Sequence, residues 1–311
     1  MSMTLVMTEN EVAKERDRWL EVRRDTIGAS DIASIMGVPG AYGTPTTVYY
    51  SKVAGDAQPT TLAMELGTYL EEFVAQKLRE ARPSWDIRPG GLYVNAQRPW
   101  MSATFDRLVL KEGHTAAGDV VAPAQIKTAY NGDGWGQDGT DDIPVHYLAQ
   151  GLWEMAVGGF SQVVFPVLFL QARQLRIYEI PWDADAEKDV AVMLAEAAEF
   201  RERIVARTPP PVDWRPQTTA TLKRVFSCTE DREVQIAEEF ELDLRIAKAT
   251  LQDAKMQYGL MENRLRARMG SAARAVSHDG RLVATRSISP VKEHVRKAGT
   301  RDTIYLKGPG N

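Results

Sequence analysis

An aspartate and a lysine that could share one reaction centre stand out in this 311-residue chain. Asp106 precedes the tripeptide Gln125-Ile126-Lys127 by nineteen residues. Carboxylate and amide oxygens are hard ligands of the kind that hold Mg²⁺, and a lysine beside such a centre orients an attacking water. Residues i and i+2 of a strand share one face, so Gln125 and Lys127 are predicted to point into one site. The pattern therefore predicts metal-assisted hydrolysis.

The elements that must position these residues follow from hydrophobic periodicity and from the signals that start and stop helices. Helices are predicted at 9–24, 46–53, 62–82, 147–157 and 184–207, and a short one within 27–37 follows a turn and a Ser/Asp cap and stops at Gly37. Strands are predicted at 92–94, 101–110, 120–129, 163–170 and 176–180. This order of elements predicts an α/β fold with a mixed central sheet flanked by helices.

The run Thr208-Pro209-Pro210-Pro211 is the clearest boundary in the chain. It predicts a core over 1–212 and an appendage over 213–311. Within the appendage, apolar residues spaced by four and three from 240 to 265 predict one long helix that ends at Gly270. We expect this helix to pack on a neighbour in the same chain rather than in a dimeric coiled coil. Short strands are predicted within 272–289 and at 303–307.

Composition places the chain among globular proteins and excludes several classes. Hydrophobic residues make up 44% of the sequence, and no apolar run approaches the length of a membrane span. One cysteine and four scattered histidines exclude a disulfide framework and give no zinc-ligand spacing. The N-terminal residues lack the layout of a signal peptide, so the expected compartment is the cytoplasm. The net charge is −4, yet residues 215–311 hold 18 Lys and Arg against 12 Asp and Glu, a bias that suits nucleic acid or a solvated surface.

Further candidates lie in the first half of the chain. Glu71 shares a helical face with Val74 and Leu78, so its carboxyl is predicted to point inward. Arg23 and Ser30 flank a tight turn and a helix start, a combination suited to gripping a phosphate. Each of these features is common on its own, and an isolated acid on a helix is usually solvated.

Taken together, five motifs in order over residues 23–150 resemble those of the YqaJ-like viral recombinases, the family of lambda-type phage alkaline exonucleases within the PD-(D/E)xK nuclease superfamily. The motifs are Arg23-x₆-Ser30 with Ile27-Gly28-Ala29-Ser30-Asp31 inside it, Gly67-x₃-Glu71, Met101-Ser102-Ala103-Thr104-Phe105-Asp106, Gln125-Ile126-Lys127, and Ile143-Pro144-x₂-Tyr147-x₂-Gln150. In this chain Phe105 stands where the family has proline, Thr104 where it has serine, and Gln125 where it has glutamate.

The resemblance implies a restriction-endonuclease-like core and a Mg²⁺-dependent exonuclease, with Mn²⁺ as a substitute, that degrades one strand of duplex DNA from its 5′ end. It implies that Lys127 assists the attacking water. The implied metal ligands are Asp106, Gln125, the main-chain carbonyl of Ile126, and Glu71. The implied contacts to DNA or its 5′-phosphate are Arg23, Ser30, Thr104 and Gln150.

The resemblance also implies partners and a setting. The expected partners are double-stranded DNA ends and a phage single-strand annealing protein that receives the 3′ single strand. A homo-oligomer is expected, with a ring among the forms the family adopts, in the cytoplasm of a phage-infected or prophage-bearing bacterial host. Trp135, in a loop rich in glycine and aspartate, could contact the DNA end, although an aromatic side chain that anchors the loop to its own core is the commoner case.

Gln125 leaves three interpretations open. It is an engineered replacement of glutamate that traps substrate uncut, which we favour. Alternatively the chain is a naturally non-catalytic module that binds DNA ends or regulates recombination. In the third interpretation another acid, Asp119 or Glu112, supplies the missing charge. Under the first two, the chain as it stands has little or no nuclease activity.

Overall fold

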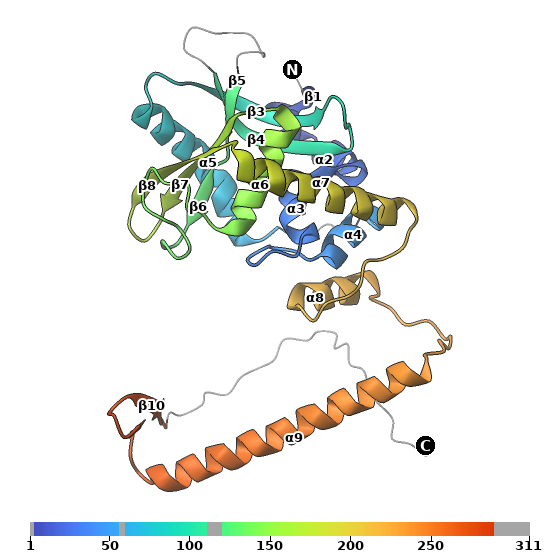
Figure 1. The fold of residues 1–311 in the computed structure, drawn as a ribbon, viewed down its shortest axis with the longest axis vertical. Coiled ribbons are helices and arrows are strands. Elements are labelled where there is room, and N and C mark those ends of the chain that lie inside the picture. Colours follow the sequence, from blue (N-terminus) through green and yellow to red (C-terminus); the bar gives the residue numbers. More distant parts are fainter. Residues whose placement is uncertain (1–2, 56–59, 111–119, 289–311) are drawn as a thin grey trace. The chain divides into compact units, whose positions relative to one another are not determined.

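The computed structural model describes residues 3–55, 60–110 and 120–288 (Figure 1). Contacts divide the chain into two compact units, Met1–Ser227 and Cys228–Asn311. The first unit carries every residue that the sequence assigns to the site. The predicted fold class, a mixed central sheet flanked by helices with a long C-terminal helix, is confirmed.

An eight-stranded mixed sheet forms the centre of the first unit. Its strands are β1 (Met3–Thr8), β2 (Ile27–Gly28), β3 (Asp86–Asn95), β4 (Met101–Leu110), β5 (Val120–Ala124), β6 (Lys127–Ala129), β7 (Gln162–Phe169) and β8 (Gln174–Pro181). β4 pairs antiparallel with β3 and β5, and β7 pairs parallel with both β5 and β6. Strands β1 and β2 were not predicted from the sequence.

β5 and β6 lie end to end along β7, because Ala124 is opposite Val164 and Lys127 is opposite Val167. The continuous strand predicted over 120–129 is therefore interrupted at Gln125 and Ile126. The physical reason is that the Ile126 N–H donates to the Asp106 carboxylate at 2.8 Å instead of joining the ladder. The interruption lies within the motif that was expected to carry the chemistry.

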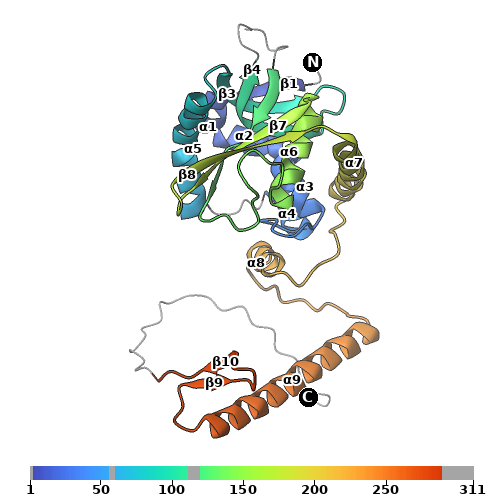
Figure 2. The ribbon, with the colours of Figure 1, turned by 60° about the vertical axis from the view of Figure 1, so that its left-hand side comes forward.

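Helices cover both faces of this sheet. They are α1 (Glu9–Lys14), α2 (Arg16–Asp25), α3 (Ala29–Ile35), α4 (Pro45–Val53), α5 (Leu62–Ala81), α6 (Val145–Gly158), α7 (Ala184–Val205) and α8 (Pro216–Val225). α5 lies on one face, where Val74 and Leu78 are fully buried, and α3, α6 and α7 lie on the other (Figures 1 and 2). The larger hydrophobic core is on the α6 side, around the fully buried Trp153 and Phe165.

The first unit extends beyond the proline run because α8 packs against α4. The hydroxyl groups of Thr44 and Thr218 are 2.8 Å apart, those of Thr47 and Thr221 are 3.2 Å apart, and all four residues are buried. The compact unit thus ends later in the chain than the predicted boundary at residue 212, and the division of function between 1–212 and 213–311 stays a prediction.

The second unit contains α9 (Glu238–Met269) and a hairpin of β9 (Arg274–Val276) and β10 (Leu282–Thr285). The predicted long helix is confirmed, and it ends at Gly270 as expected. Within the described residues none of its side chains is buried, and the packing of this helix on a neighbour stays a prediction. The strand predicted at 303–307 lies outside the described residues. None of the described helices is long and apolar enough to span a membrane.

Candidate active site

A cavity of about 220 Å³ brings together six of the residues that the sequence singles out. They are Arg23, Ser30, Thr104, Asp106, Gln125 and Gln150, from α2, α3, β4, the β5–β6 junction and α6. Residues more than one hundred positions apart in the chain therefore meet in one place.

Alternation along β4 supplies the polar wall of this cavity. Ala103 and Phe105 are buried in the hydrophobic core, whereas Thr104 and Asp106 line the cavity. The Asp106 carboxylate accepts the N–H of Ile126, which ties the end of β5 to β4. Phe105, which stands where the family pattern has proline, thus serves as a core residue.

Gln125 is 6% exposed, and its Oε1 atom has no hydrogen-bond partner among the described residues. A buried acceptor without a donor costs free energy unless a water or a cation satisfies it. Gln125 lines the same cavity as Asp106. The donor chemistry therefore fits a hard cation, for which a neutral amide oxygen and a carboxylate are both suitable ligands. The described residues contain no group of three or more His, Cys, Asp or Glu that could hold a metal ion.

Lys127 is held by a chain of side chains on α6. Its Nζ donates to Gln150 Oε1 at 3.1 Å, and Gln150 Nε2 donates to Glu154 Oε1 at 2.9 Å. Lys127 also lies 5.0 Å from the centre of the Tyr147 ring, a cation–π contact. The oxygen and the nitrogen of the Gln150 amide thus both form hydrogen bonds within the protein, and Gln150 also lines the cavity.

Glu154 is fully buried and was not singled out from the sequence. Burial raises its pKa to about 8, against the opposing charge of Lys127. Its spacing of four residues from Gln150 on one helix was the available signal, because such residues lie on the same face. An acid at that position in an otherwise apolar helical segment is a sign of a buried polar contact.

The charges near the cavity influence one another. Burial raises the pKa of Asp106. Burial lowers the pKa of Lys127, and the negative charges of Asp106 and Glu154 act in the opposite direction on Lys127. Burial and the charge of Asp106 also raise the pKa of Glu71, to about 7. Strongly shifted groups in a cavity are characteristic of functional sites, although structural ion networks shift pKa values as well.

Glu71 lies in a neighbouring cavity of about 730 Å³ that shares Thr104 and Asp106 with the first. There it forms an ion pair of 2.7 Å with Arg107, whose side chain is only 3% exposed. Arg107 also pairs with Glu9 and Glu72. Sequence reasoning missed Arg107, although an arginine within an apolar strand was a signal of buried pairing. Glu71 is therefore close enough to Asp106 for the charge of Asp106 to raise the pKa of Glu71, but the Glu71 carboxylate is already paired with Arg107.

Trp19 joins the residues at the other end of the cavity. The Arg23 guanidinium lies 4.6 Å from the centre of its ring, and its Nε1 donates to Thr104 Oγ1 at 3.3 Å. Arg23 Nη2 donates to Ser30 Oγ at 2.8 Å. These contacts bring a guanidinium and two hydroxyl groups together, a set of donors suited to an anion such as phosphate. Trp19 was not singled out from the sequence.

Trp135 lies in the loop between β6 and α6 and does not line this cavity. Its ring centre is 5.4 Å from that of Tyr147, 5.9 Å from Phe169 and 5.2 Å from Tyr178. These contacts anchor the loop to the core. Contact of Trp135 with a DNA end stays a prediction.

Comparison with known proteins finds a family model that matches the segment that builds the cavity. Residues 18–161 match the family model described as the YqaJ-like viral recombinase domain. None of the curated proteins compared with the chain matches it.

Solved structures similar to this one include exonucleases. LHK-Exo in complex with dAMP is 18% identical, covers 68% of this chain and 98% of its own, and gives a TM-score of 0.48. A second structure of LHK-Exo, an alkaline exonuclease from Laribacter hongkongensis, is 20% identical, covers 61% and 97%, and gives 0.44. A phage-related exonuclease from Haemophilus somnus 129PT is 10% identical, covers 58% and 96%, and gives 0.41.

The matched segment includes each residue that lines the cavity, from Trp19 to Gln150. The resemblance inferred from the five motifs is thereby confirmed. Residues 18–161 of this chain thus match the YqaJ-like viral recombinase domain, the family that the five motifs resemble.

Proposed function

We propose that this protein is a Mg²⁺-dependent exonuclease of a phage recombination system, which degrades one strand of double-stranded DNA from its 5′ end. The observation that supports this most is a single cavity in which an anion-binding set, Arg23 with Ser30 and Thr104, lies beside Asp106. A nuclease that starts at a DNA end needs both parts, one to hold the terminal phosphate and one to cut the next bond. The family of the segment agrees with this activity.

In this proposal the protein's own residues bind the terminal phosphate, orient the attacking water and stabilise the developing charge. Arg23, Ser30 and Thr104 bind the 5′-phosphate through charge-assisted hydrogen bonds. Lys127 orients the attacking water and stabilises the charge that develops on the phosphate. Gln150 fixes the direction of Lys127 through the bond to its Nζ. Glu154 supports Gln150 from behind.

The residues proposed to hold Mg²⁺, or Mn²⁺ in its place, are Asp106, Gln125, the carbonyl of Ile126, and Glu71. When bound, the metal supplies an activated water and polarises the phosphate oxygens. Glu71 would have to leave its contact with Arg107, or act through a water, in order to take part.

Gln125 determines how active the chain is. A neutral amide in place of a carboxylate removes one of the negative charges that hold the cation. Changes in residues that only support a metal ligand already reduce metal affinity or activity by about 10–100-fold. We therefore expect Gln125→Glu to raise nuclease activity at least about a hundredfold on that scale.

The test is a gel time course on 5′-phosphorylated linear duplex with Mg²⁺, comparing the chain as it stands with Gln125→Glu. The matched control is Gln171→Glu, which adds the same charge at an exposed turn between β7 and β8. Adding Asp106→Asn to the Gln125→Glu form should abolish any gain. Equal activity of the chain with and without Gln125→Glu would remove Gln125 from the metal site.

A second candidate function is a non-catalytic module that binds DNA ends or regulates recombination, and the neutral Gln125 is the observation that favours it. If neither form cuts DNA while both still bind its ends, this function replaces the exonuclease. Under either function we propose DNA ends and a single-strand annealing protein as partners, a homo-oligomeric assembly, and action in the cytoplasm of the bacterial host.

A further inference from the structure

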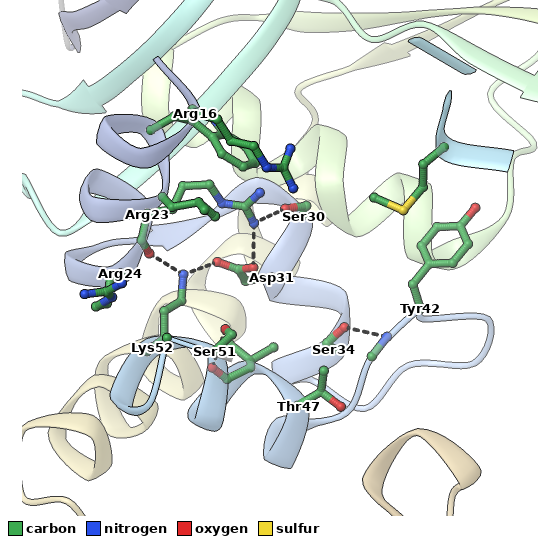
Figure 3. A pocket seen from close by; sticks show the side chains of 16 residues that line it. Arg16, Arg23, Arg24, Ser30, Asp31, Ser34, Tyr42, Thr47, Ser51 and Lys52 are labelled. Carbon is green, nitrogen blue, oxygen red and sulfur yellow. Dashed lines mark hydrogen bonds and ion pairs between the residues drawn. The ribbon is translucent and has the colours of Figure 1, made fainter. Parts of the chain in front are cut away.

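A buried ion cluster lies directly behind Arg23 (Figure 3). Asp31 Oδ1 accepts from Arg23 Nη2 at 3.0 Å, and Asp31 Oδ2 accepts from Lys52 Nζ at 2.6 Å. Lys52 Nζ also donates to the main-chain carbonyl of Arg23 at 2.5 Å, which closes a ring of contacts between α2, α3 and α4. The Asp31 carboxylate accepts a further hydrogen bond from the N–H of Gly28.

Lysine is seldom buried to this degree unless it is paired. Lys52 is 5% exposed and Asp31 is 7% exposed, and both lie on the wall of a cavity of about 260 Å³ that shares Arg23 with the site cavity. A buried pair of this kind gains little net stability compared with apolar residues of the same volume. The arrangement therefore calls for an explanation beyond the stability of the fold.

The three side chains carry two positive charges and one negative charge. Burial alone would raise the pKa of Asp31, but the charges of Lys52 and Arg23 outweigh burial and hold its pKa at about 2. Burial lowers the pKa of Lys52, and the carboxylate beside it opposes that change. With Asp31 ionised and balanced by Lys52, the cluster retains one net positive charge, which resides on Arg23 at the edge of the site cavity.

We propose that Asp31 and Lys52 are positioning residues for recognition of the DNA 5′-phosphate. Asp31 fixes the Arg23 guanidinium beside Ser30, and Lys52 balances the charge of Asp31 so that the potential at Arg23 stays positive for the phosphate. The inference rests on the proposed function, because it takes a terminal phosphate as the group that Arg23 binds.

This role is distinct from a purely structural one. A structural pair would affect folding and would affect all DNA ends equally. A pair that keeps the potential at Arg23 positive affects binding of ends that carry a 5′-phosphate more than binding of ends that carry a 5′-hydroxyl. The decisive quantity is therefore the ratio of the two affinities, rather than either affinity alone.

The experiment measures binding of the full chain to two blunt duplexes of one sequence, one with 5′-phosphate and one with 5′-hydroxyl ends, in the presence of a chelator that prevents cutting. Lys52→Met leaves Asp31 to neutralise Arg23, so the preference for the phosphate should fall about tenfold or more, as expected for the loss of a charge-assisted contact. The double variant Lys52→Met with Asp31→Asn removes both charges and leaves Arg23 as the sole charge of the cluster. It should recover most of the lost preference.

Lys188→Met is the matched control, because it removes one lysine from an exposed site on α7 whose side chain is 74% exposed. It should leave the preference unchanged. If Lys52→Met does not fold, as judged by its melting curve, Lys52→Gln takes its place, since it keeps a donor for Asp31 without the charge.

An unchanged preference in the Lys52 variant, or a double variant no better than the single one, would overturn the inference. The variant Arg23→Gln distinguishes failure of this inference from failure of the proposed function. If Arg23→Gln reduces the preference while Lys52→Met does not, only the role of Lys52 and Asp31 is wrong. If Arg23→Gln itself has no effect, the phosphate site of the proposed function is wrong, and the inference falls with it.

Discussion

At the scale of single residues, the site depends on how its buried charges balance. Lys127 lies among Asp106, Glu71 and Glu154, and each of these three carboxyl groups has a raised pKa. For Glu71 and Glu154, whose pKa values are about 7 and about 8, the folded protein holds protons that an unfolded chain would release at neutral pH. A cation bound beside these carboxyl groups would stabilise their ionised forms and release those protons.

Glu154 gives this balance a measurable consequence. Its pKa is about 8 in the folded protein, against an ordinary value of 4.5. Below pH 4.5 the carboxyl is neutral in both states, whereas above pH 8 the folded protein bears the full cost of a buried charge. The free energy of unfolding should therefore decline as pH rises from about 4.5 to about 8.

Glu154→Gln should remove that decline, so the variant should gain stability relative to the parent chain as pH rises through this range. Urea unfolding at several pH values between 5 and 9 measures the difference. Glu196→Gln, at an exposed position on α7, is the control and should run parallel to the parent. Parallel curves for Glu154→Gln as well would mean that Glu154 is not held neutral in the fold.

At the scale of elements, short helices hold the site from the side away from the sheet. α4 carries Lys52 to the ion cluster behind Arg23, and α8 packs on α4 through pairs of threonine hydroxyl groups. Thr44 accepts the N–H of Thr47 as the N-cap of α4, so the same hydroxyl that starts the helix also meets α8. A segment that follows the proline run thus supports the helix that positions Lys52.

Thr218→Val tests this support. Valine keeps the shape of threonine but removes its hydrogen bonds to the buried hydroxyl of Thr44 and to the carboxylate of Asp213. We expect the free energy of unfolding to fall by about 1–3 kcal/mol, the usual contribution of one neutral hydrogen bond and one to a charged group. Thr219→Val, one position along and exposed, should change it by less than about 0.5 kcal/mol. Equal effects of the two changes would contradict the role given to the hydroxyl pairs.

At the scale of the whole molecule, the chain consists of two compact units, and all cavity residues belong to the first. The second unit contributes a long helix whose described side chains are all outside any core, and a large share of the basic residues. This composition suits an arm that contacts DNA, or a solvated surface, as the charge bias of residues 215–311 predicts.

Truncation tests whether the folded unit ends at Ser227, as the contacts indicate, or at residue 212, as the proline run predicts. A chain ending at Ser227 should melt within about 2–4 °C of the full chain and should keep its preference for 5′-phosphorylated ends. A chain ending at residue 212 lacks α8 and exposes Thr44 and Thr47, so it should be clearly less stable. Thermal melting and duplex binding of the two truncated forms provide the comparison. Similar melting temperatures for both would place the end of the folded unit at the proline run.

Much of this could be read from the sequence because the signals are local. Apolar periodicity located α5, α6, α7 and α9, and alternation located β4, since both patterns depend only on neighbouring residues. The spacing of Asp106 and Lys127, with the motifs around Arg23 and Gln150, was enough to indicate the family. Charged residues on solvated faces could be set aside by the same patterns.

The remaining features depend on residues that are distant in the chain. The interruption between β5 and β6 arises because the Ile126 N–H meets a carboxylate on another strand, which no local pattern encodes. Lys52 looks like an ordinary charged residue of its helix, and the apolar sequence around Glu154 does not name a partner for it. Only packing sets Lys52 against Asp31 and Glu154 against Gln150. Local sequence thus specifies which elements form and which side chains alternate. Long-range packing specifies which charges lose water, and the loss of water gives those charges their shifted pKa values and their place in the site.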